Sequence, residues 1–317
     1  MARPRFLTVL GNACADTGYR LATLPRPGET VIALSVTGDL GGKGLNQAVA
    51  AARAGIVPQF IAPVSQDAVA DRISAALRLE GIDDRDLIRR EGVSDSSLIM
   101  TDRDGENVIV SDTTQAEATS FQEVASRLLL TQAHLLLLQG NLSQATTMAA
   151  VEAARAAGAA VALNAAPMRD WLRQPKVDIL IANRGEAAEI AGLPVTTAPE
   201  VILAALSPLV VAITLGAGGC LLRDHFETIH IAAPAVPVRD SAGAGDVFAG
   251  VFIAEWLRTG NSTAAARLAV MAASTKVARP GTLSAFPTRS EIDQLRQCLG
   301  REPEKSRSTS TWPHLLP

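Results

Sequence analysis

The chain has 317 residues, of which 48% are hydrophobic and 19% are charged, and its formal net charge at pH 7 is -3. These values favour a folded protein with a large core and exclude a disordered chain. The small negative net charge gives no indication of a surface that binds nucleic acid. The three cysteines are odd in number and lack CxxC spacing, which favours free thiols in a reducing, cytoplasmic compartment.

Two segments superficially resemble targeting or membrane signals. The apolar run at residues 6–10 ends at Gly11, so it is shorter than the roughly 7–15 apolar residues of a signal peptide. Residues 201–222 carry no charge, but Pro208 interrupts them and glycines crowd their end. We therefore expect neither a signal peptide nor a membrane span, but a helix, a turn, a buried strand and a glycine loop at 201–222.

In chain order, short apolar runs alternate with alanine-rich helical patterns. The runs have strand length and are apolar on both faces, which is typical of buried parallel strands. Strands are predicted at 6–10, 60–64, 135–138, 160–163, 177–181 and 209–215, and helices at 45–54, 68–79, 144–157, 186–191, 247–257 and 263–277. The alternation predicts an α/β fold with a mainly parallel central sheet flanked by helices.

Two stretches, at about 13–38 and 94–113, instead alternate polar and apolar residues, which predicts antiparallel strands with one exposed face. Strands are expected at 30–37, 97–101 and 107–111, with a hairpin turn at 102–105. We assign these insertions to a small β-sheet lid on one domain of residues 1–300. Exposed lid edges would offer a surface for a homodimer. Residues 301–317 are expected to be a disordered tail.

A glycine-rich turn, Asp240-Ser-Ala-Gly-Ala-Gly-Asp246, leads into the apolar helix expected at 247–257. Such a turn directs successive backbone N–H groups toward an anion at the start of a helix. Asp246 would lie in the first helical turn, where it could orient an attacking hydroxyl and accept its proton. Taken alone, the motif is equally consistent with an aspartate that caps a helix after a flexible turn.

A second glycine motif, Gly41-Gly-Lys-Gly-Leu-Asn-Gln-Ala48, opens the helix expected at 45–54. Lys43 and Asn46 are three residues apart and share a helix face, so they could hold sugar hydroxyls or a phosphate. A simple strand-to-helix turn with a solvated lysine explains the motif equally well. Neither glycine motif is a Walker A loop or a Rossmann fingerprint, and the missing fingerprint disfavours a dehydrogenase.

Polar residues follow several predicted strands, where ligands bind in open parallel sheets. Asn183 and Glu186 could hold a hydrated Mg²⁺, although an N-cap with its capping-box partner is the commoner use of this spacing. The segment at 214–219 could let a strand end approach a nucleotide or simply turn the chain. Asn12 and Asp16 could contact sugar hydroxyls or serve as turn residues.

The two glycine motifs, in this order and about two hundred residues apart, resemble those of the ribokinase (PfkB-type) carbohydrate kinases. The resemblance implies a three-layer ribokinase-like fold with a β lid. It also implies transfer of the γ-phosphoryl group of MgATP to a hydroxyl of a small sugar. A nucleoside kinase of the same superfamily and a non-catalytic regulator that binds sugar or nucleotide remain as alternatives.

The resemblance further implies a role for each matching residue. Asp246 would be the catalytic base, and the N–H groups of Gly243, Ala244 and Gly245 would form an anion hole. The sugar would be held by Asn12, Asp16, Gly42, Lys43, Asn46 and Asn141. The nucleotide would contact Asn183, Thr214, Gly216 and Gly219, with Glu186 near Mg²⁺. Asp240 and carbonyl groups near Ala242, Arg279 and Gly281 resemble a site for K⁺.

Three positions depart from the family pattern. Asn141 is neutral and shorter than the glutamate that ribokinases usually offer to the sugar, so the resemblance does not identify ribose as the acceptor. Arg184 stands where related enzymes often have an acidic residue beside the Mg²⁺ position. Ala285 replaces a serine that is often found near the cation site.

Overall fold

The computed structural model describes residues 5–103, 106–132, 134–173 and 176–300. Its centre is a nine-stranded sheet with the order β13-β12-β11-β10-β9-β8-β1-β4-β5. The strands from β5 to β11 are parallel, whereas β12 and β13 form an antiparallel edge, so the sheet is mainly parallel as predicted. These strands are β1 (Phe6–Leu10), β4 (Gln59–Ser65), β5 (Leu87–Arg90), β8 (His134–Leu138), β9 (Ala160–Asn164), β10 (Ile179–Asn183), β11 (Val210–Thr214), β12 (Cys220–Arg223) and β13 (Thr228–Ile231).

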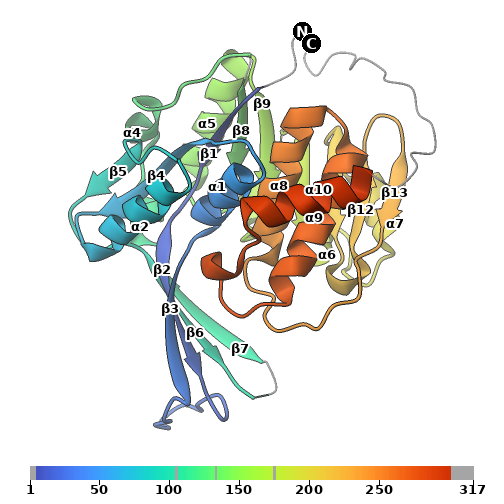
Figure 1. Ribbon diagram of the computed structural model, residues 1–317. Coiled ribbons are helices and arrows are strands. Elements are labelled where there is room, and N and C mark those ends of the chain that lie inside the picture. Colours follow the sequence, from blue (N-terminus) through green and yellow to red (C-terminus); the bar gives the residue numbers. More distant parts are fainter. Residues whose placement is uncertain (1–4, 104–105, 133, 174–175, 301–317) are drawn as a thin grey trace.

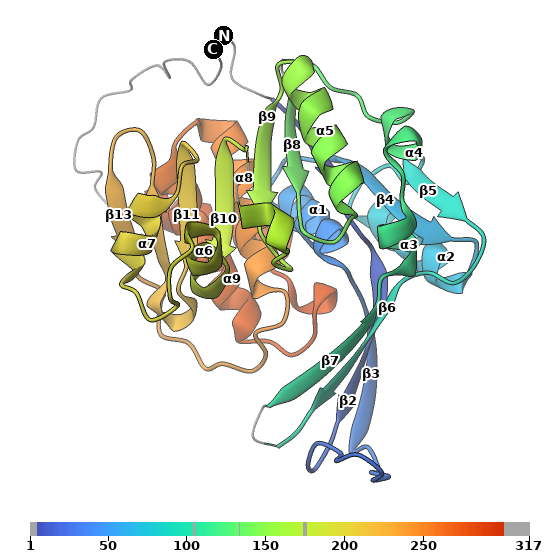
Figure 2. The same cartoon turned by 180° about the vertical axis from the view of Figure 1, so that it is seen from behind.

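Helices cover both faces of this sheet, which gives the three-layer α/β fold that the sequence predicts. On one face lie α1 (Lys43–Arg53), α2 (Ala68–Leu79), α8 (Ala244–Thr259), α9 (Ser262–Val277) and α10 (Arg289–Gly300) (Figure 1). On the other lie α5 (Gln144–Ala156), α6 (Arg184–Ala191) and α7 (Pro199–Ala205) (Figure 2). Neighbouring strand residues point to opposite faces, so Leu135 and Leu137 pack into one hydrophobic cluster while Leu136 and Leu138 pack into the other.

The lid is a separate four-stranded sheet with the order β3-β2-β6-β7. It consists of β2 (Cys14–Arg20), β3 (Ser35–Gly41), β6 (Ser96–Thr101) and β7 (Asn107–Asp112), and it projects away from the central sheet (Figure 1). The strand predicted at 30–37 was placed too early, since β3 begins at Ser35. The reason is that its partner β2 ends at Arg20, which pairs with Ser35.

Several predicted features differ from the observed elements or fall outside the described residues. The strand expected at 177–181 begins at Ile179, and the sequence patterns missed β5, β12, β13 and α10. The hairpin turn at 102–105 includes residues 104–105, which lie outside the described residues, although the N–H of Asp102 donates to the carbonyl oxygen of Glu106 at 3.0 Å. The tail predicted at 301–317 also lies outside them.

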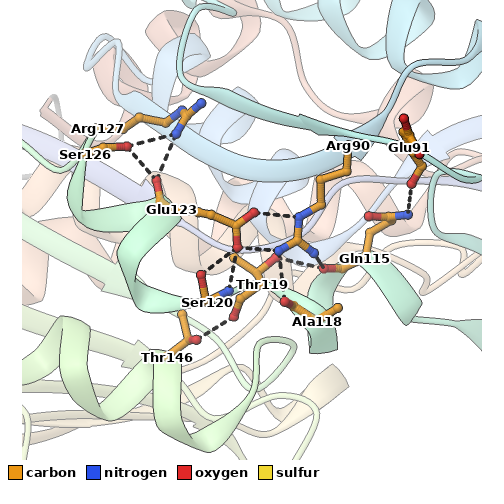
Figure 3. Close-up of polar contacts among 10 residues, drawn as sticks. All are labelled: Arg90, Glu91, Gln115, Ala118, Thr119, Ser120, Glu123, Ser126, Arg127 and Thr146. Atoms are coloured by element: carbon orange, nitrogen blue, oxygen red, sulfur yellow. Dashed lines mark hydrogen bonds and ion pairs between the residues drawn. The ribbon is translucent and has the colours of Figure 1, made fainter.

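A polar network at the base of the lid joins β5 to the short helices α3 (Thr114–Ala118) and α4 (Phe121–Ala125) (Figure 3). Arg90 pairs with Glu123 and donates to the carbonyl oxygen of Gln115. The Gln115 side chain in turn donates to the carbonyl oxygen of Glu91. The Arg90 guanidinium lowers the pKa of Glu123 to about 2, so the pair stays charged at neutral pH. The network thereby fixes residues 91–95, which connect β5 to the lid strand β6.

Candidate active site

Helix α1 begins in close contact with the end of β1, and glycine makes this contact possible. Gly42 has a φ of 93°, in the left-handed region that favours glycine. A Cβ on Gly44 would lie 2.7 Å from the backbone nitrogen of Asn12. The N–H of Leu45 donates to the carbonyl oxygen of Asn12 at 3.0 Å. The glycine motif therefore places the first turn of α1 directly beside the carboxyl end of β1.

Helix α8 begins opposite α1, and Asp246 in its first turn is only 5% exposed. Its carboxylate accepts hydrogen bonds from Nδ2 of Asn46 and Nε2 of Gln47, both at 3.0 Å. Nζ of Lys43 lies 4.0 Å from Oδ1 of the same carboxylate. The structure thus brings the two glycine motifs together, although they are about two hundred residues apart in the chain.

Gln47 connects Asp246 to the central sheet, a role that the sequence analysis did not assign. Its Nε2 also donates to Oδ1 of Asn164 at the end of β9, at 2.9 Å. Its Oε1 accepts from Nε2 of Gln139, which follows β8, at 2.9 Å. Gln47 is fully buried, so these contacts hold its amide in one orientation. The signal in the sequence was its position beside Asn46 in the glycine motif.

Three buried amide oxygens near this network have no hydrogen-bond partner in the part of the chain that the structure describes. They are Oδ1 of Asn46, Oε1 of Gln139 and Oδ1 of Asn141. A buried acceptor without a donor costs free energy, so such groups call for an explanation. A polyhydroxyl ligand would supply O–H donors to them, which fits a sugar.

Asp16 lies on β2, where the lid joins the site. A Cβ on Gly41 would lie 2.0 Å from Oδ2 of Asp16, so this carboxylate lies against the end of β3. The thiol of Cys14 donates to its Oδ1 at 3.3 Å. Burial raises the pKa of Asp16, and the negative charges of Asp39 and Asp246 raise it further. Asp16 is therefore close enough to Asp246 for the two charges to interact.

Asp39 of β3 connects the lid to the loop that follows α9. Its Oδ2 accepts from the backbone N–H of Thr282 at 3.0 Å and from the hydroxyl of Ser284 at 2.7 Å. No sequence motif pointed to Asp39, because its partners lie more than two hundred residues away.

A cleft of about 370 Å³ lies at the carboxyl ends of β10 and β11. Its lining includes Asn183, Thr214 and Gly216, three of the residues expected on the nucleotide side. Asn183 caps α6: its side chain accepts from the N–H of Glu186 at 2.9 Å, and Oε2 of Glu186 accepts from the N–H of Asn183 at 2.8 Å. The capping box that the spacing suggested is therefore present.

Glu186 is also electrostatically linked to Lys43 and Asp246. Burial raises its pKa, the charge of Lys43 lowers it, and the charge of Asp246 raises it. Gly219, expected on the nucleotide side, has another explanation. Its φ is 87°, and a Cβ there would lie 2.0 Å from the carbonyl oxygen of Ile231, so it allows close packing against β13.

Asp240 organises the turn before α8. Its carboxylate accepts from the backbone N–H groups of Ala242 at 2.8 Å and Gly281 at 3.1 Å. The fully buried Lys276 of α9 donates from Nζ to the carbonyl oxygen of Asp240 at 2.8 Å. The guanidinium of Arg279 pairs with Glu291. The candidate ligand at Arg279 is therefore its backbone carbonyl, as the resemblance implies.

The described parts of the chain contain no cluster of three or more His, Cys, Asp and Glu side chains that could hold a metal ion. None of their helices combines the length and the apolar character needed to cross a membrane.

Comparison with known proteins gives a consistent result. The family model for pfkB family carbohydrate kinases matches residues 5–289. The ribokinase of Haemophilus influenzae is 30% identical over 296 residues, which cover 90% of this chain and 96% of that protein. The deoxyribokinase of Salmonella typhi is 28% identical over 304 residues, covering 92% and 98% of the two chains. A structure of Arabidopsis thaliana ribokinase complexed with ribose and ATP is 26% identical and covers 94% of this chain and 99% of that chain, with a TM-score of 0.80.

The three-layer fold, the lid and these relatives together define the class of protein. This protein is an ATP-dependent carbohydrate kinase with a ribokinase-like fold. More specifically, the chain belongs to the pfkB family of carbohydrate kinases.

Proposed function

We propose that this protein transfers the γ-phosphoryl group of MgATP to a hydroxyl of a small sugar, with Asp246 as the base. The observation that carries this proposal is the contact of Asp246 with Asn46 and Gln47 at the start of α8. Each carboxylate oxygen accepts one amide N–H, which fixes its orientation and leaves lone pairs for a substrate hydroxyl. The carboxylate can then align that hydroxyl with the phosphorus and accept its proton.

The sugar would lie between the end of β1 and the lid. Lys43 and Asn46 would contact its hydroxyls from α1, Asp16 would do so from β2, and Asn12, Gly42 and Asn141 would complete the sugar-side surface. The partnerless oxygens of Asn46 and Asn141 support this placement, because sugar hydroxyls would satisfy them. Closure of the lid over the sugar would exclude water that otherwise competes for the phosphoryl group.

ATP would occupy the cleft lined by Asn183, Thr214 and Gly216. The neighbouring strands β11, β10, β9, β8 and β1 end at the same edge of the sheet, which supports a position for ATP beside the proposed sugar site. The backbone N–H groups of Gly243 and Gly245 would face the phosphoryl group, with the start of α8 favouring negative charge. The N–H of Ala244, which the resemblance also assigned to the anion hole, donates instead to the carbonyl oxygen of Ser241 at 3.2 Å.

Glu186 would hold Mg²⁺ together with the ATP phosphates. Its Oε2 is engaged in the capping box, but a magnesium ion bound to phosphates needs only one or two carboxylate contacts and keeps several waters. The electrostatic coupling of Glu186 to Lys43 and Asp246 supports a position beside the reacting groups. When bound, Mg²⁺ would supply positive charge that neutralises the phosphate groups of ATP.

Release of ADP in a coupled assay, measured with separate panels of pentoses, hexoses and nucleosides, tests this function. We expect turnover with at least one sugar, well above the rate without an acceptor. Turnover with nucleosides alone would favour a nucleoside kinase, for which the low aromatic content of 3% offers few stacking partners. Sugar or ATP binding by calorimetry without turnover on any acceptor would favour a non-catalytic regulator and contradict the proposal.

We also propose a cytoplasmic homodimer that forms through the lid. Cys14, Cys220 and Cys298 are all free thiols, which supports a reducing compartment. Large apolar side chains are exposed on the lid sheet, including Val36, Ile109 and Val110, and β3 and β7 form its open edges.

Sedimentation velocity tests the dimer. The wild-type chain should sediment with the mass of a dimer, and the lid variant Ile109→Lys should sediment as a monomer. Leu79→Lys, at an exposed position on α2 of the main body, is the control and should remain dimeric. A wild-type monomer at micromolar concentration would exclude this assembly.

A further inference from the structure

The side chain of Lys276 lies beside Asp240, one of the residues to which the family resemblance assigned a K⁺ ion. Lys276 is in the last turn of α9, yet it is fully buried. Its Nζ donates to the carbonyl oxygen of Asp240 at 2.8 Å and lies 3.7 Å from Oδ1 of Asp240. Asp240 is the side chain that the resemblance assigned to the cation site. Its carbonyl oxygen and its carboxylate therefore already face the positive charge of Lys276.

The residues around Asp240 do not fit an additional K⁺ ion. Both oxygens of its carboxylate accept backbone N–H groups, from Ala242 and Gly281, and its carbonyl oxygen accepts from Lys276. A second cation on these oxygens would lie a few ångströms from the ammonium group. Two like unit charges that close repel strongly at the effective dielectric constant of a protein. Ala285, which replaces a serine often present near such a site, offers no side-chain oxygen either.

The negative charge that stabilises the ammonium group of Lys276 comes from groups on three segments of the chain. Burial lowers the pKa of Lys276, and the charges of Asp240 and Asp39 offset this effect only in part. The carbonyl groups in the last turn of α9 also carry partial negative charge, which stabilises a cation there. A lysine that is fully buried is rare unless its ammonium group is paired in this way.

We propose that the ammonium group of Lys276 is a built-in monovalent cation, which replaces K⁺ and makes the proposed kinase activity independent of added monovalent cations. Lys276 is a positioning residue, because it acts through Asp240 and the turn that leads to Gly243. Its hydrogen bond holds the backbone three residues before the N-cap of α8. The N–H groups of Gly243 and Gly245 therefore keep their orientation, and the fixed positive charge adds to the field at the phosphoryl position.

The cation dependence of the wild-type enzyme gives the first test, and it rests on the proposed function. Turnover is measured in choline chloride and in KCl at the same ionic strength, with Tris rather than ammonium buffers. We expect kcat and KM for ATP to be the same within twofold in the two salts. Activation of several-fold or more by K⁺ would overturn the proposal.

Two substitutions at the same position separate charge from packing. Lys276→Ala removes the ammonium group and opens space, so we expect kcat in choline chloride to fall by roughly tenfold or more, the scale of a lost electrostatic contact near a phosphoryl group. KCl or methylammonium chloride should restore most of it. Lys276→Met removes the charge but fills the space, so it should be equally impaired and not rescued. Full activity of Lys276→Ala without added cations would contradict the proposal.

An experiment without turnover keeps the inference distinct from the proposed function. Crystals of the wild-type protein and of Lys276→Ala are soaked in RbCl, and anomalous diffraction locates the rubidium ions. We expect a peak beside Asp240 in the variant and none there in the wild type. A rubidium peak beside Asp240 in the wild type would refute the proposal even if the variant failed to fold or the acceptor sugar remained unidentified.

Discussion

Replacement of Asp246 by Asn should lower kcat by roughly 10²–10⁴-fold, which is the usual contribution of a general base. An amide cannot accept the proton that the attacking hydroxyl loses. It would also place an NH₂ group opposite one of the two amide donors, Asn46 or Gln47, which the carboxylate now satisfies. The KM values for sugar and ATP should change much less than kcat, because the substitution preserves the size of the side chain. Steady-state kinetics with each substrate varied in turn would measure this separation.

The control is Asp71→Asn, which makes the same chemical change in the first turn of α2, on the surface. It should leave kcat and both KM values unchanged. Circular dichroism and thermal unfolding would establish that both variants are folded. If Asp246→Asn retained near-wild-type turnover, Asp246 would not be the base and the mechanism would have to be abandoned.

Replacement of Gly250 by Ala should destabilise the protein by about 2 kcal/mol or more, within or above the range for overpacked cores. A Cβ on Gly250 would lie 2.5 Å from the carbonyl oxygen of Gln47 and 2.6 Å from Cβ of Ala50. These are backbone and short side-chain atoms of α1, so they cannot rotate away. Helices α1 and α8 would have to separate, which would also pull Gln47 from Asp246 and reduce kcat about tenfold or more.

Gly245→Ala makes the same substitution five residues earlier in the same helix and serves as the stability control. A Cβ on Gly245 would have no atom within 4 Å. It should therefore leave the unfolding free energy unchanged or raise it by about 0.5–1 kcal/mol, because alanine favours the helix. Urea unfolding of both variants would compare them. Equal stability of the two variants would show that α1 and α8 do not pack as closely as this geometry requires.

The edge strands β12 and β13 were missed because each has only four residues, so the apolar pattern is too short to be distinctive. Helix α10 was missed although Ile292, Leu295 and Leu299 recur at helical spacing and pack against the core. The strand at 30–37 was misplaced because a lid strand begins where its partner can pair with it, and the apolar pattern alone does not contain that register.

The alternating strands and helices of the main sheet, the presence of a lid and the two helices that follow the glycine motifs were predicted from the sequence alone, although these helices begin at Lys43 and Ala244, two to three residues earlier than expected. These features depend on local periodicity and on backbone conformations that glycine permits, so neighbouring residues suffice to reveal them.

Only the tertiary structure showed that Gln47 fixes the orientation of Asp246 and that Lys276 faces Asp240. In the sequence, Gln47 is one more polar residue on a helix, and Lys276 looks like a solvated lysine in a last helical turn. Their partners are set by how α1, α8, α9 and the strand ends pack, which joins residues far apart in the chain. Because both side chains are fully buried, their hydrogen bonds hold the amide of Gln47 and the ammonium group of Lys276 in one orientation.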